Sequence, residues 1–532
     1  NTILFALILT VAAIPIALPA VMSVIMAIGS AKLAKMNAIV SKLVCVEELA
    51  GIDILCSDKT GTLTQNKLTV GDLVLLHKTD QQVLLRAAAL ACNPDNPDAI
   101  DQAILDKLDD KKILKGITIK QFIPFDPINK RIEVTLQDNG GTFKVSKGAP
   151  QVIAALCKDN STDIAQQVNT LAQKGFRTLA VAIKHGRKDW QLLGLVPLFD
   201  PPREDCAQTI DELNQLGVSI KMVTGDHNAI ARETARSLGM GQRIVSASDL
   251  LDQPHADQRT LLAQIEHADG FSEVFPSHKF AIVQDLQNRD HIVGMTGDGV
   301  NDAPALKQAD VGIAVSGATD AARSSADLVL TEPGLSIITH AIKESRCIFG
   351  RMKSYAMYRI SETVRLLLFL AISMITFNDY PLTAVMIVLI ALLNDIPIMM
   401  IAYDHMKPAP KPTNWDLREV ITISVGLAVI GVIATFGLYW LALYHWKIPF
   451  DQIKTVVFIG LLVGGNLTIY LTRNEGWLLA RPLPAPKFLI ATLATQIMGV
   501  LIGVYGWFVA PIGWHYGLLI VIYLLVWFII CM

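Results

Sequence analysis

A basic excess and paired cysteines are both missing from this sequence. Its 532 residues carry 46 lysines and arginines against 48 aspartates and glutamates, which gives a formal net charge of -2. Nucleic-acid-binding proteins usually concentrate positive charge to match phosphates, so nucleic acid is not an expected partner. The seven cysteines form no CxxC pair and no regular spacing. This distribution does not fit a disulfide framework, and it predicts reduced thiols facing a cytoplasm.

Long apolar runs are missing from the middle of the chain, between about residues 35 and 346, although 52% of all residues are hydrophobic. The runs lie at the N-terminus and in the C-terminal third. A helix that crosses a lipid bilayer needs roughly 20 apolar residues. Seven stretches approach that length, and they cover residues 2–28, 354–377, 381–402, 419–443, 454–472, 487–510 and 514–532. The sequence therefore predicts a multi-pass membrane protein with a large polar insert after its first span.

Positive charge gathers in two loops of the apolar region, near residues 403–418 and 473–487. Lysine and arginine are enriched in loops on the cytoplasmic side of a membrane. If all seven runs span the bilayer, the polar insert lies on the same side as these two loops. We therefore expect a cytoplasmic insert, in a plasma membrane or a prokaryotic inner membrane.

The polar insert contains short apolar stretches that read as buried strands. They cover residues 52–57, 219–223, 291–295 and 311–315, and helical patterns at 205–216 and 278–288 lie between them. Alternating strands and helices predict a parallel α/β sheet, whose strand ends converge on one crevice. Residues 73–194 instead show a helical pattern at 81–91 and β-like stretches at 143–146 and 178–183. We expect this segment to form a separate α+β domain inserted into the sheet domain.

The run Asp-Lys-Thr-Gly-Thr-Leu-Thr at residues 58–64 follows the first of these strands. A carboxylate at a strand end, followed by a turn that presents backbone N–H groups, is suited to attack a phosphorus atom. Asp58 would then become an aspartyl-phosphate. An ordinary surface turn is the alternative interpretation, and the motifs that follow in the chain argue against it.

This run matches the phosphorylation signature of P-type ATPases, and companion motifs occur in the order typical of that family. They are Lys-Gly-Ala-Pro at 147–150, Asp-Pro-Pro-Arg at 200–203, Thr-Gly-Asp at 224–226 and Thr-Gly-Asp-Gly-Val-Asn-Asp-Ala-Pro at 296–304. Over nearly its whole length the chain resembles the plasma-membrane proton pumps of this family. The resemblance implies a multidomain protein with an α-helical transmembrane bundle. It also implies a haloacid-dehalogenase-like (Rossmann-like) α/β phosphorylation domain with an inserted α+β nucleotide-binding domain.

The resemblance also implies domain boundaries. Residues 1–36 would form a transmembrane helix and stalk, 37–72 and 195–345 the phosphorylation domain, 73–194 the nucleotide-binding domain, and 346–532 a C-terminal transmembrane domain of about six helices. Complete pumps carry further spans and an actuator domain before the proline-containing helix. This sequence contains neither, so we expect the missing N-terminal part of the same polypeptide to be a partner needed for turnover.

The phosphoryl-transfer residues follow from the family pattern. Asp298 would bind Mg²⁺ beside Asp58 and the backbone carbonyl of Thr60. Asn301 and Asp302 would support this site, and Lys279, Thr224 and Asp226 match the family's phosphate-binding positions. In related haloacid-dehalogenase phosphatases a second aspartate follows the nucleophile by two residues. Thr60 occupies that position here, which favours an enzyme that keeps its phosphoenzyme.

Five residues of the inserted segment resemble the family's ATP-binding positions. They are Phe125 for adenine stacking, Lys130 nearby, Lys147 in the pocket, Arg177 for the phosphates and Asp101 near the adenine. Without the surrounding motifs, a core phenylalanine and exposed charged side chains would explain them equally well. The resemblance favours binding for Lys147 and Arg177, favours it mildly for Phe125 and Lys130, and leaves Asp101 evenly balanced.

The membrane part lacks the ligands that larger cations need. Pro15 and Pro19 resemble the unwound centre of the family's ion-site helix, where freed carbonyls can face a cavity. No glutamate stands between them, as it does in calcium, sodium and potassium pumps, and no cysteine, as in heavy-metal pumps. Hard divalent cations want six or more oxygen ligands, several of them carboxylates. The sequence therefore argues against those cations.

A proton is the ion that the remaining intramembrane charges favour. Asp395 follows Asn394 deep within an apolar run, and Arg365 lies in the neighbouring run. A carboxylate whose pKa rises on desolvation and falls when a guanidinium approaches can load and release one proton. This pattern matches the proton pumps. A permanent Asp395–Arg365 ion pair that only fixes two helices is the structural alternative.

Three other functions stay open on the sequence. The same chemistry could move another cation such as Mg²⁺ or K⁺, the chain could be a membrane-tethered haloacid-dehalogenase phosphatase, or it could be a non-catalytic partner. Thr60 and the large insert disfavour the phosphatase. The presence of Asp58, Lys279 and Asp298 disfavours a non-catalytic protein.

Overall fold

The fold is taken from a computed structural model that describes residues 17–76, 79–108, 114, 116–138, 140–158, 162–186, 188–252, 258–377, 380–473 and 481–532. The chain divides into two compact units. Asn1–Ile52 and His340–Met532 form the first, which we call the helical unit. Asp53–Thr339 form the second, which we call the sheet unit.

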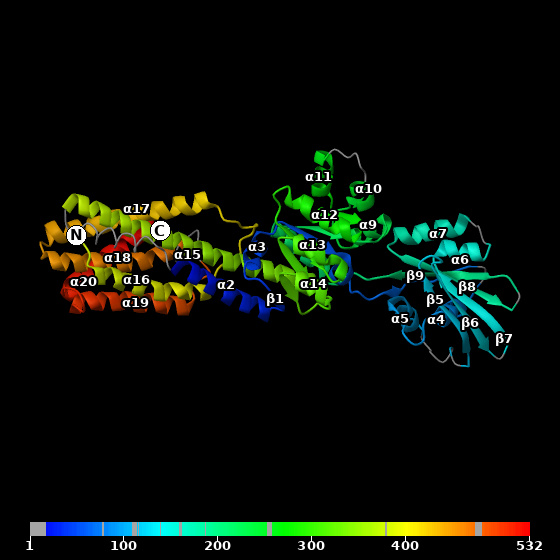
Figure 1. Ribbon diagram of the computed structural model, residues 1–532. Helices are drawn as coiled ribbons and strands as arrows, with labels where there is room; N and C mark the ends of the chain where they lie inside the picture. The colour runs from blue at the N-terminus through cyan, green and yellow to red at the C-terminus, as the bar shows by residue number, and fades with distance from the viewer. Residues whose placement is uncertain are drawn as a thin grey trace. The chain divides into compact units, whose positions relative to one another are not determined.

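A parallel sheet in the sheet unit carries the predicted strand-end motifs (Figure 1). Its order is β15 (Leu328–Leu330), β14 (Val311–Ala314), β13 (Val293–Gly297), β2 (Ile54–Asp58), β10 (Ser219–Val223), β12 (Gly270–Ser272) and β11 (Ile244–Ser246). Each neighbouring pair is parallel. Val223 is paired with Asp58, and Met295 with Cys56, so β10, β2 and β13 end at the same edge. The predicted parallel α/β fold is confirmed.

Helices cover this sheet and complete its core. They are α8 (Cys206–Gln215), α9 (Asn228–Ser237), α10 (Ala247–Leu251), α11 (Gln258–His267), α12 (Pro276–Gln287), α13 (Ala303–Gln308) and α14 (Asp320–Ser325). Ile282 of α12 and Leu306 of α13 pack with Cys56 and Met295 in one buried cluster. A strand predicted from residue 291 begins instead at Val293, because the side chain of Asp53 bonds the His291 ring and the Ile292 N–H. The central strand is therefore fixed by packing on both sides of the phosphorylation motif.

A second, antiparallel sheet lies in the same unit. Its order is β3 (Thr69–Val70), β9 (Gln191–Phe199), β8 (Arg177–His185), β7 (Gly141–Gly148), β6 (Arg131–Asp138) and β5 (Thr118–Asp126), and β4 (Val74–Leu75) also pairs with β9. Residues of β8 alternate between two cores. Val181 packs with α4 (Gln81–Leu90) and α5 (Ala99–Asp106), whereas Ala180 and Ala182 pack with α6 (Pro150–Leu156) and α7 (Thr162–Gln173). Figure 1 shows these two helix pairs on opposite faces.

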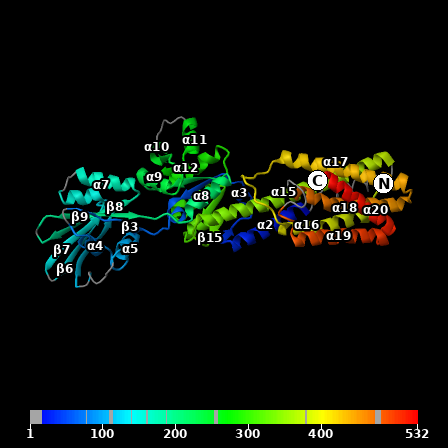
Figure 2. The same cartoon turned by 180° about the vertical axis from the view of Figure 1, so that it is seen from behind.

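Seven helices of the described residues are long and apolar enough to span a membrane. They are α2 (Ala17–Lys35), α15 (Leu335–Phe377), α16 (Ala384–Met399, with Met400–Tyr403 as a 3-10 turn), α17 (Leu417–Trp440, with Leu441–His445 as a π turn), α18 (Phe450–Arg473), α19 (Pro486–Tyr505) and α20 (Gly513–Cys531). Helix α18 is the most enclosed and packs against α16, α17, α19 and α20 (Figure 2). The predicted multi-pass membrane architecture is confirmed. Two shorter elements, β1 (Ala38–Val40) and α3 (Cys45–Gly51), complete the helical unit.

Two of these helices differ from the predicted spans. Helix α15 begins at Leu335 although its sequence becomes apolar only near residue 354, because helical hydrogen bonding continues through a charged first half. The first candidate span extends to Lys35, past the predicted end at residue 28, and residues 2–16 of that prediction lie outside the described residues. Pro15 lies outside the described residues. Pro19 lies in α2, and its carbonyl accepts a hydrogen bond from the Ser23 hydroxyl at 2.9 Å.

Candidate active site

Asp58 is held at the carboxyl end of the central strand β2. Its backbone N–H donates to the hydroxyl of Thr296, at the corresponding end of β13, over 2.9 Å. The next residues form a tight turn over Lys59–Leu63, in which Thr60 is extended and Gly61 has a φ of 74°. A left-handed conformation of this kind strongly favours glycine. The strand and the turn together present the Asp58 carboxylate at the sheet edge.

Lys279 joins two carboxylates at this edge. Its ammonium Nζ lies 2.8 Å from Oδ2 of Asp58 and 2.7 Å from Oδ1 of Asp302. Helix α12 begins at Pro276, directly after Phe275, and carries Lys279 to this edge in its first turn. The other oxygen of Asp302 accepts hydrogen bonds from the N–H groups of Asp298 and Gly299. Asp302 therefore fixes both the lysine and the loop that carries Asp298.

Three carboxylates converge in this site. Oxygen atoms of Asp58, Asp298 and Asp302 lie within 4.8 Å of one another. Hard cations such as Mg²⁺ prefer carboxylate oxygens, so the donor set fits this ion. Because Asp302 already accepts from Lys279 and two backbone N–H groups, Asp58 and Asp298 are the carboxylates best able to serve as ligands. Asn301 is exposed in the adjoining turn Val300–Asp302.

The concentration of negative charge shifts the pKa values of the site. Burial raises the pKa of Asp58, Lys279 lowers it, and Asp302 and Asp298 raise it further, so the net direction is upward. Burial and the charge of Asp302 also raise the pKa of Asp298. Burial lowers the pKa of Lys279, but Asp58 and Asp302 outweigh this effect and raise it overall. The carboxylates thus favour additional positive charge, whereas the lysine stays protonated.

Thr224 and Asp226 follow β10 beside this cluster. The N–H of Asp226 donates to the Thr224 hydroxyl at 3.1 Å. The carboxylate of Asp226 forms an ion pair with Lys59 at 2.5 Å. Lys59 is the residue directly after Asp58, so the pair connects the β10 loop to the turn that follows Asp58.

The two connections between the sheets are joined through Asp200. Its carboxylate accepts from the Thr64 hydroxyl at 2.6 Å and from the Lys67 N–H at 3.1 Å. Thr64 also forms a β-bridge with Pro202. These contacts bring the Asp-Pro-Pro-Arg motif and the end of the phosphorylation motif into one paired segment.

Lys147 and Asp101 lie together beneath the surface of the antiparallel sheet. Nζ of Lys147 is 2.5 Å from Oδ1 of Asp101, and both side chains are only 3% exposed. The same ammonium lies 3.4 Å from Sγ of Cys92, while Asp101 also accepts from the Asn93 N–H. In this conformation the pair is enclosed, and its ammonium is already bound by a carboxylate.

The other predicted nucleotide-binding residues are exposed. Phe125, on the edge strand β5, is 57% exposed, and Ile123 on the same strand is 43% exposed. Lys130 lies in the β5–β6 turn with a φ of 47°. A Cβ at Gly148 would lie only 2.5 Å from the Lys130 carbonyl, so this turn approaches the Lys-Gly-Ala-Pro motif closely. Arg177 is exposed at the first position of β8.

The membrane charges pair differently from the sequence prediction. Asp395 of α16 lies 3.4 Å from Arg359 of α15, whereas Arg365 was the predicted partner. Arg365 instead forms an ion pair with Glu362 at 3.2 Å and donates to the Leu461 carbonyl at 2.5 Å. The two arginines are six residues apart, or about 9 Å along a helix, so only one of them is level with Asp395. Asn394 is buried next to Asp395.

Comparisons with known proteins agree with this geometry. A family model of haloacid dehalogenase-like hydrolases matches residues 52–310, which contain five strands of the parallel sheet (β2, β10, β11, β12 and β13) and the inserted antiparallel sheet. Over its whole length the chain is 48% identical to the Methanocaldococcus jannaschii protein named "Putative cation-transporting ATPase MJ1226", and it spans 67% of that protein. The chain belongs to the P-type ATPase family. It is a multi-pass membrane protein with a haloacid-dehalogenase-like domain.

Three residues of this P-type ATPase make contacts that the sequence does not predict. Thr296 begins the motif at 296–304, and its hydroxyl accepts a hydrogen bond from the Asp58 N–H. Lys59 pairs with Asp226. The sequence does indicate that Arg359 is paired, because a second arginine within an apolar helix needs a partner of opposite charge. The sequence could not show which carboxylate that partner would be.

Proposed function

We propose that this P-type ATPase exports protons at the expense of ATP, through a phosphorylated Asp58. The observation that carries the chemistry is the contact of Lys279 with both Asp58 and Asp302 at the end of the central strand. Phosphoryl transfer depends chiefly on positioning and on charge neutralisation. Lys279 supplies a fixed positive charge for this purpose, next to a carboxylate that can attack.

In the proposed step, an oxygen of Asp58 forms a bond to the γ-phosphorus of ATP. The bond from that phosphorus to the bridging oxygen breaks, and ADP leaves with the electron pair. Asp58, Asp298 and the carbonyl of Thr60 would hold Mg²⁺, which supplies charge neutralisation between the carboxylates and the phosphates. Thr224, Asp226 and Asn301 would border the phosphate, and Asp302 keeps Lys279 and the Asp298 loop in place.

The adenosine end of ATP would bind the antiparallel sheet. Phe125 offers an exposed ring beside the exposed Ile123, which suits stacking on a flat base. Lys130 lies close to the Lys-Gly-Ala-Pro motif, and Arg177 is free to extend toward phosphates. The enclosed Lys147–Asp101 pair would shape this pocket, and a direct contact of Lys147 with ATP would require the pair to open.

Asp395 would carry the proton. It is partly enclosed within a transmembrane helix and faces the guanidinium of Arg359. When the guanidinium is close, the ionised carboxylate is favoured, and when it withdraws, proton binding is favoured. Pro19 at the start of α2 and the buried Asn394 would line the path.

The phosphorylation step is tested with γ-labelled ATP and Mg²⁺. We expect stable labelling of the protein and complete loss of label in Asp58→Asn. Asp320→Asn is a matched control, since Asp320 is a fully exposed aspartate of α14 in the same unit. A protein that releases phosphate but never retains label would be a phosphatase, and that result would refute the proposed step.

The ion is tested with full-length protein in sealed vesicles that contain a pH-sensitive dye. ATP should acidify the vesicles, and Asp395→Asn should abolish acidification while Asp58 is still phosphorylated. Persistent acidification in Asp395→Asn would contradict the assignment of the carrier. ATP hydrolysis that depends on K⁺ or Mg²⁺ transport, without any pH change, would favour another cation.

A further inference from the structure

Glu362 is a buried carboxylate that the scheme above does not use. It lies on α15, three residues after Arg359 and three residues before Arg365, so all three lie on adjoining turns of one helix. Its side chain is only 10% exposed. Carboxylates at membrane depth are costly to keep and usually take part in function. The four charged groups of this region are therefore two carboxylates and two guanidinium groups.

We propose that Glu362 is a second proton-binding residue of the transport site. The proposal rests on proton transport as the proposed function, and it assigns to the site two exchanging carboxylates in place of one. Arg359 forms an ion pair with Asp395, and Arg365 forms an ion pair with Glu362.

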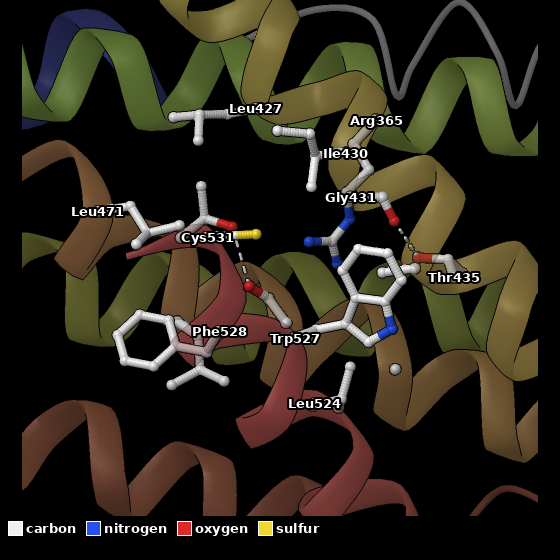
Figure 3. Close-up of a pocket in the computed structure, with 15 residues that line it drawn as sticks. Arg365, Leu427, Ile430, Gly431, Thr435, Leu471, Leu524, Trp527, Phe528 and Cys531 are labelled. Carbon is white, nitrogen blue, oxygen red and sulfur yellow. Dashed lines mark hydrogen bonds between the residues drawn. The ribbon is translucent and has the colours of Figure 1, made fainter.

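Arg365 is fixed beside Glu362 by its surroundings. A Cβ at Gly431 of α17 would lie 2.4 Å from Cδ of Arg365, and one at Gly464 of α18 would lie 3.3 Å from its Nη1. The guanidinium therefore occupies space left by glycines on two neighbouring helices. Figure 3 shows it pointing into a pocket lined by α17, α18 and α20. Arg365 is the only charged residue among those that line this pocket, so Glu362 is its balancing charge.

Glu362 meets Asn394 across another glycine of α18. A Cβ at Gly465 would lie 2.6 Å from Oε2 of Glu362 and 3.5 Å from Nδ2 of Asn394. Both side chains thus border the space beside Gly465, where an added methyl group would overlap Oε2 of Glu362. Asn394 is also the neighbour of Asp395 in the chain. The space connects Glu362 with the helix that carries the first proton-binding residue.

The hydrogen bonding of this space is incomplete in the ionised state. Oε1 of Glu362 lies at ion-pair distance from Arg365 but makes no hydrogen bond, and Oδ1 of Asn394 also has no donor among the described residues. Two buried acceptors without donors are unfavourable. A proton on Glu362 would convert one acceptor into a donor. Proton binding therefore satisfies the site as it is built.

A metal cation fits this space less well. Arg359 and Arg365 both lie close to Glu362, and a fixed positive charge repels a bound cation in a medium of low dielectric constant. Hard divalent cations also need six or more oxygen ligands. Tyr358 on the same helix interacts electrostatically with both Glu362 and Asp395, while α18 presents the uncharged Gly465 to Glu362. A proton requires no ligand shell and leaves Arg365 on the Leu461 carbonyl.

The test compares wild-type protein with Glu362→Gln in sealed vesicles. Proton flux and phosphate release are measured together between about pH 5.5 and 8. We expect Glu362→Gln to be phosphorylated normally and to move roughly half as many protons per ATP, with one ionisation lost from the pH profile. Glu362→Asp should restore part of the ratio, and Glu419→Gln, at an exposed glutamate of α17, should match the wild type.

A second variant leaves every charge in place. Gly465→Ala places a methyl group against Oε2 of Glu362 and forces this carboxylate to shift, so it should lower the proton ratio in the same direction. An unchanged ratio and pH profile in both Glu362→Gln and Gly465→Ala would overturn the second site while proton transport stands. Absence of acidification in the wild type would overturn proton transport itself, and the second site with it.

Discussion

The cluster around Asp58 and the cluster around Asp395 both gather carboxylates, yet they balance charge in opposite ways. At the sheet edge, three carboxylates share one lysine and backbone N–H groups, so negative charge exceeds positive charge. In the membrane, two carboxylates face two guanidinium groups. The sheet edge therefore has an excess of negative charge that a metal ion could balance, whereas the charges of the membrane cluster balance one another.

The difference reflects the surroundings of each cluster. The sheet edge ends in loops, where water and ligands can supply counter-charge. Within a bilayer no solvent is present to compensate an isolated charge, so each carboxylate needs a nearby cation or a proton. The pair Lys147–Asp101 is a third case, because both side chains are almost completely buried and each charge is balanced by the other.

The largest effect should come from breaking that enclosed pair. Lys147→Met leaves Asp101 buried without a cation, which should lower stability by about 3–5 kcal/mol. Thermal unfolding of purified protein measures the loss. The double variant Lys147→Met/Asp101→Leu should recover much of it, because no uncompensated charge remains.

Lys144→Met is the matched control for this comparison. Lys144 lies on the same strand and forms an ion pair with Glu133 at 3.0 Å. Its side chain is 41% exposed. Exposed pairs contribute about 1 kcal/mol or less. Equal losses in Lys144→Met and Lys147→Met would show that enclosure is not what distinguishes the two pairs.

Lys279→Gln should have a nearly equally large effect, on the rate of phosphoenzyme formation and not on the stability of the fold. It removes the fixed positive charge beside Asp58, and phosphoenzyme formation should slow by about 10²–10³-fold, as with other charge-stabilising donors. Rapid-quench labelling with γ-labelled ATP checks this. Lys307→Gln, at an exposed lysine of α13, should label at the wild-type rate.

Arg359→Gln should separate the two clusters. It removes the partner of Asp395, so proton transport should fall by about 10-fold, which corresponds to roughly 1.4 kcal/mol. Labelling of Asp58 from ATP should continue. Lys353→Gln changes a more exposed cation of the same helix, which pairs with Glu419, and should leave transport unaltered. Loss of labelling in Arg359→Gln would mean that the arginine has a structural role.

The smallest effect concerns the pH dependence of stability. The pKa of Asp58 is raised by burial, so the ionised carboxylate destabilises the folded protein and stability falls as pH rises through that pKa. Asp58→Asn removes this cost and should raise stability by on the order of 1 kcal/mol at neutral pH. The gain should shrink at low pH, where the wild-type carboxyl is protonated. Unfolding curves at several pH values in the absence of Mg²⁺ measure this gain. A gain that is the same at every pH would contradict the assignment.

Much of the site could be predicted from sequence because its signals are local. Asp58, Thr224 and Asp298 each stand directly after or near the end of a short apolar strand, and a parallel sheet brings such ends together. The later start of β13 escaped prediction, since it depends on contacts of Asp53 with distant residues. The functional roles of these side chains stay predictions until the variants are measured.

Pairing across helices could not be predicted in the same way. Arg359 and Arg365 are both arginines within one apolar helix, and nothing local distinguishes which of them is level with Asp395. The rotation and height of α15 against α16 and α18 decide this, and they follow from side-chain packing along the whole length of the helices. The burial of Lys147 with Asp101 likewise depends on how α5 packs on the antiparallel sheet.

The sequence by itself determined the phosphorylation motif, the order of strands and helices around it, and the number of apolar spans, because backbone hydrogen bonding and hydropathy act over short stretches of chain. Only the tertiary structure decided that Lys279 joins Asp58 to Asp302, that Arg359 faces Asp395, and that Glu362 shares a space with Asn394. Charges interact through space over a few ångströms, so their partners are set by folding and not by their separation in the chain.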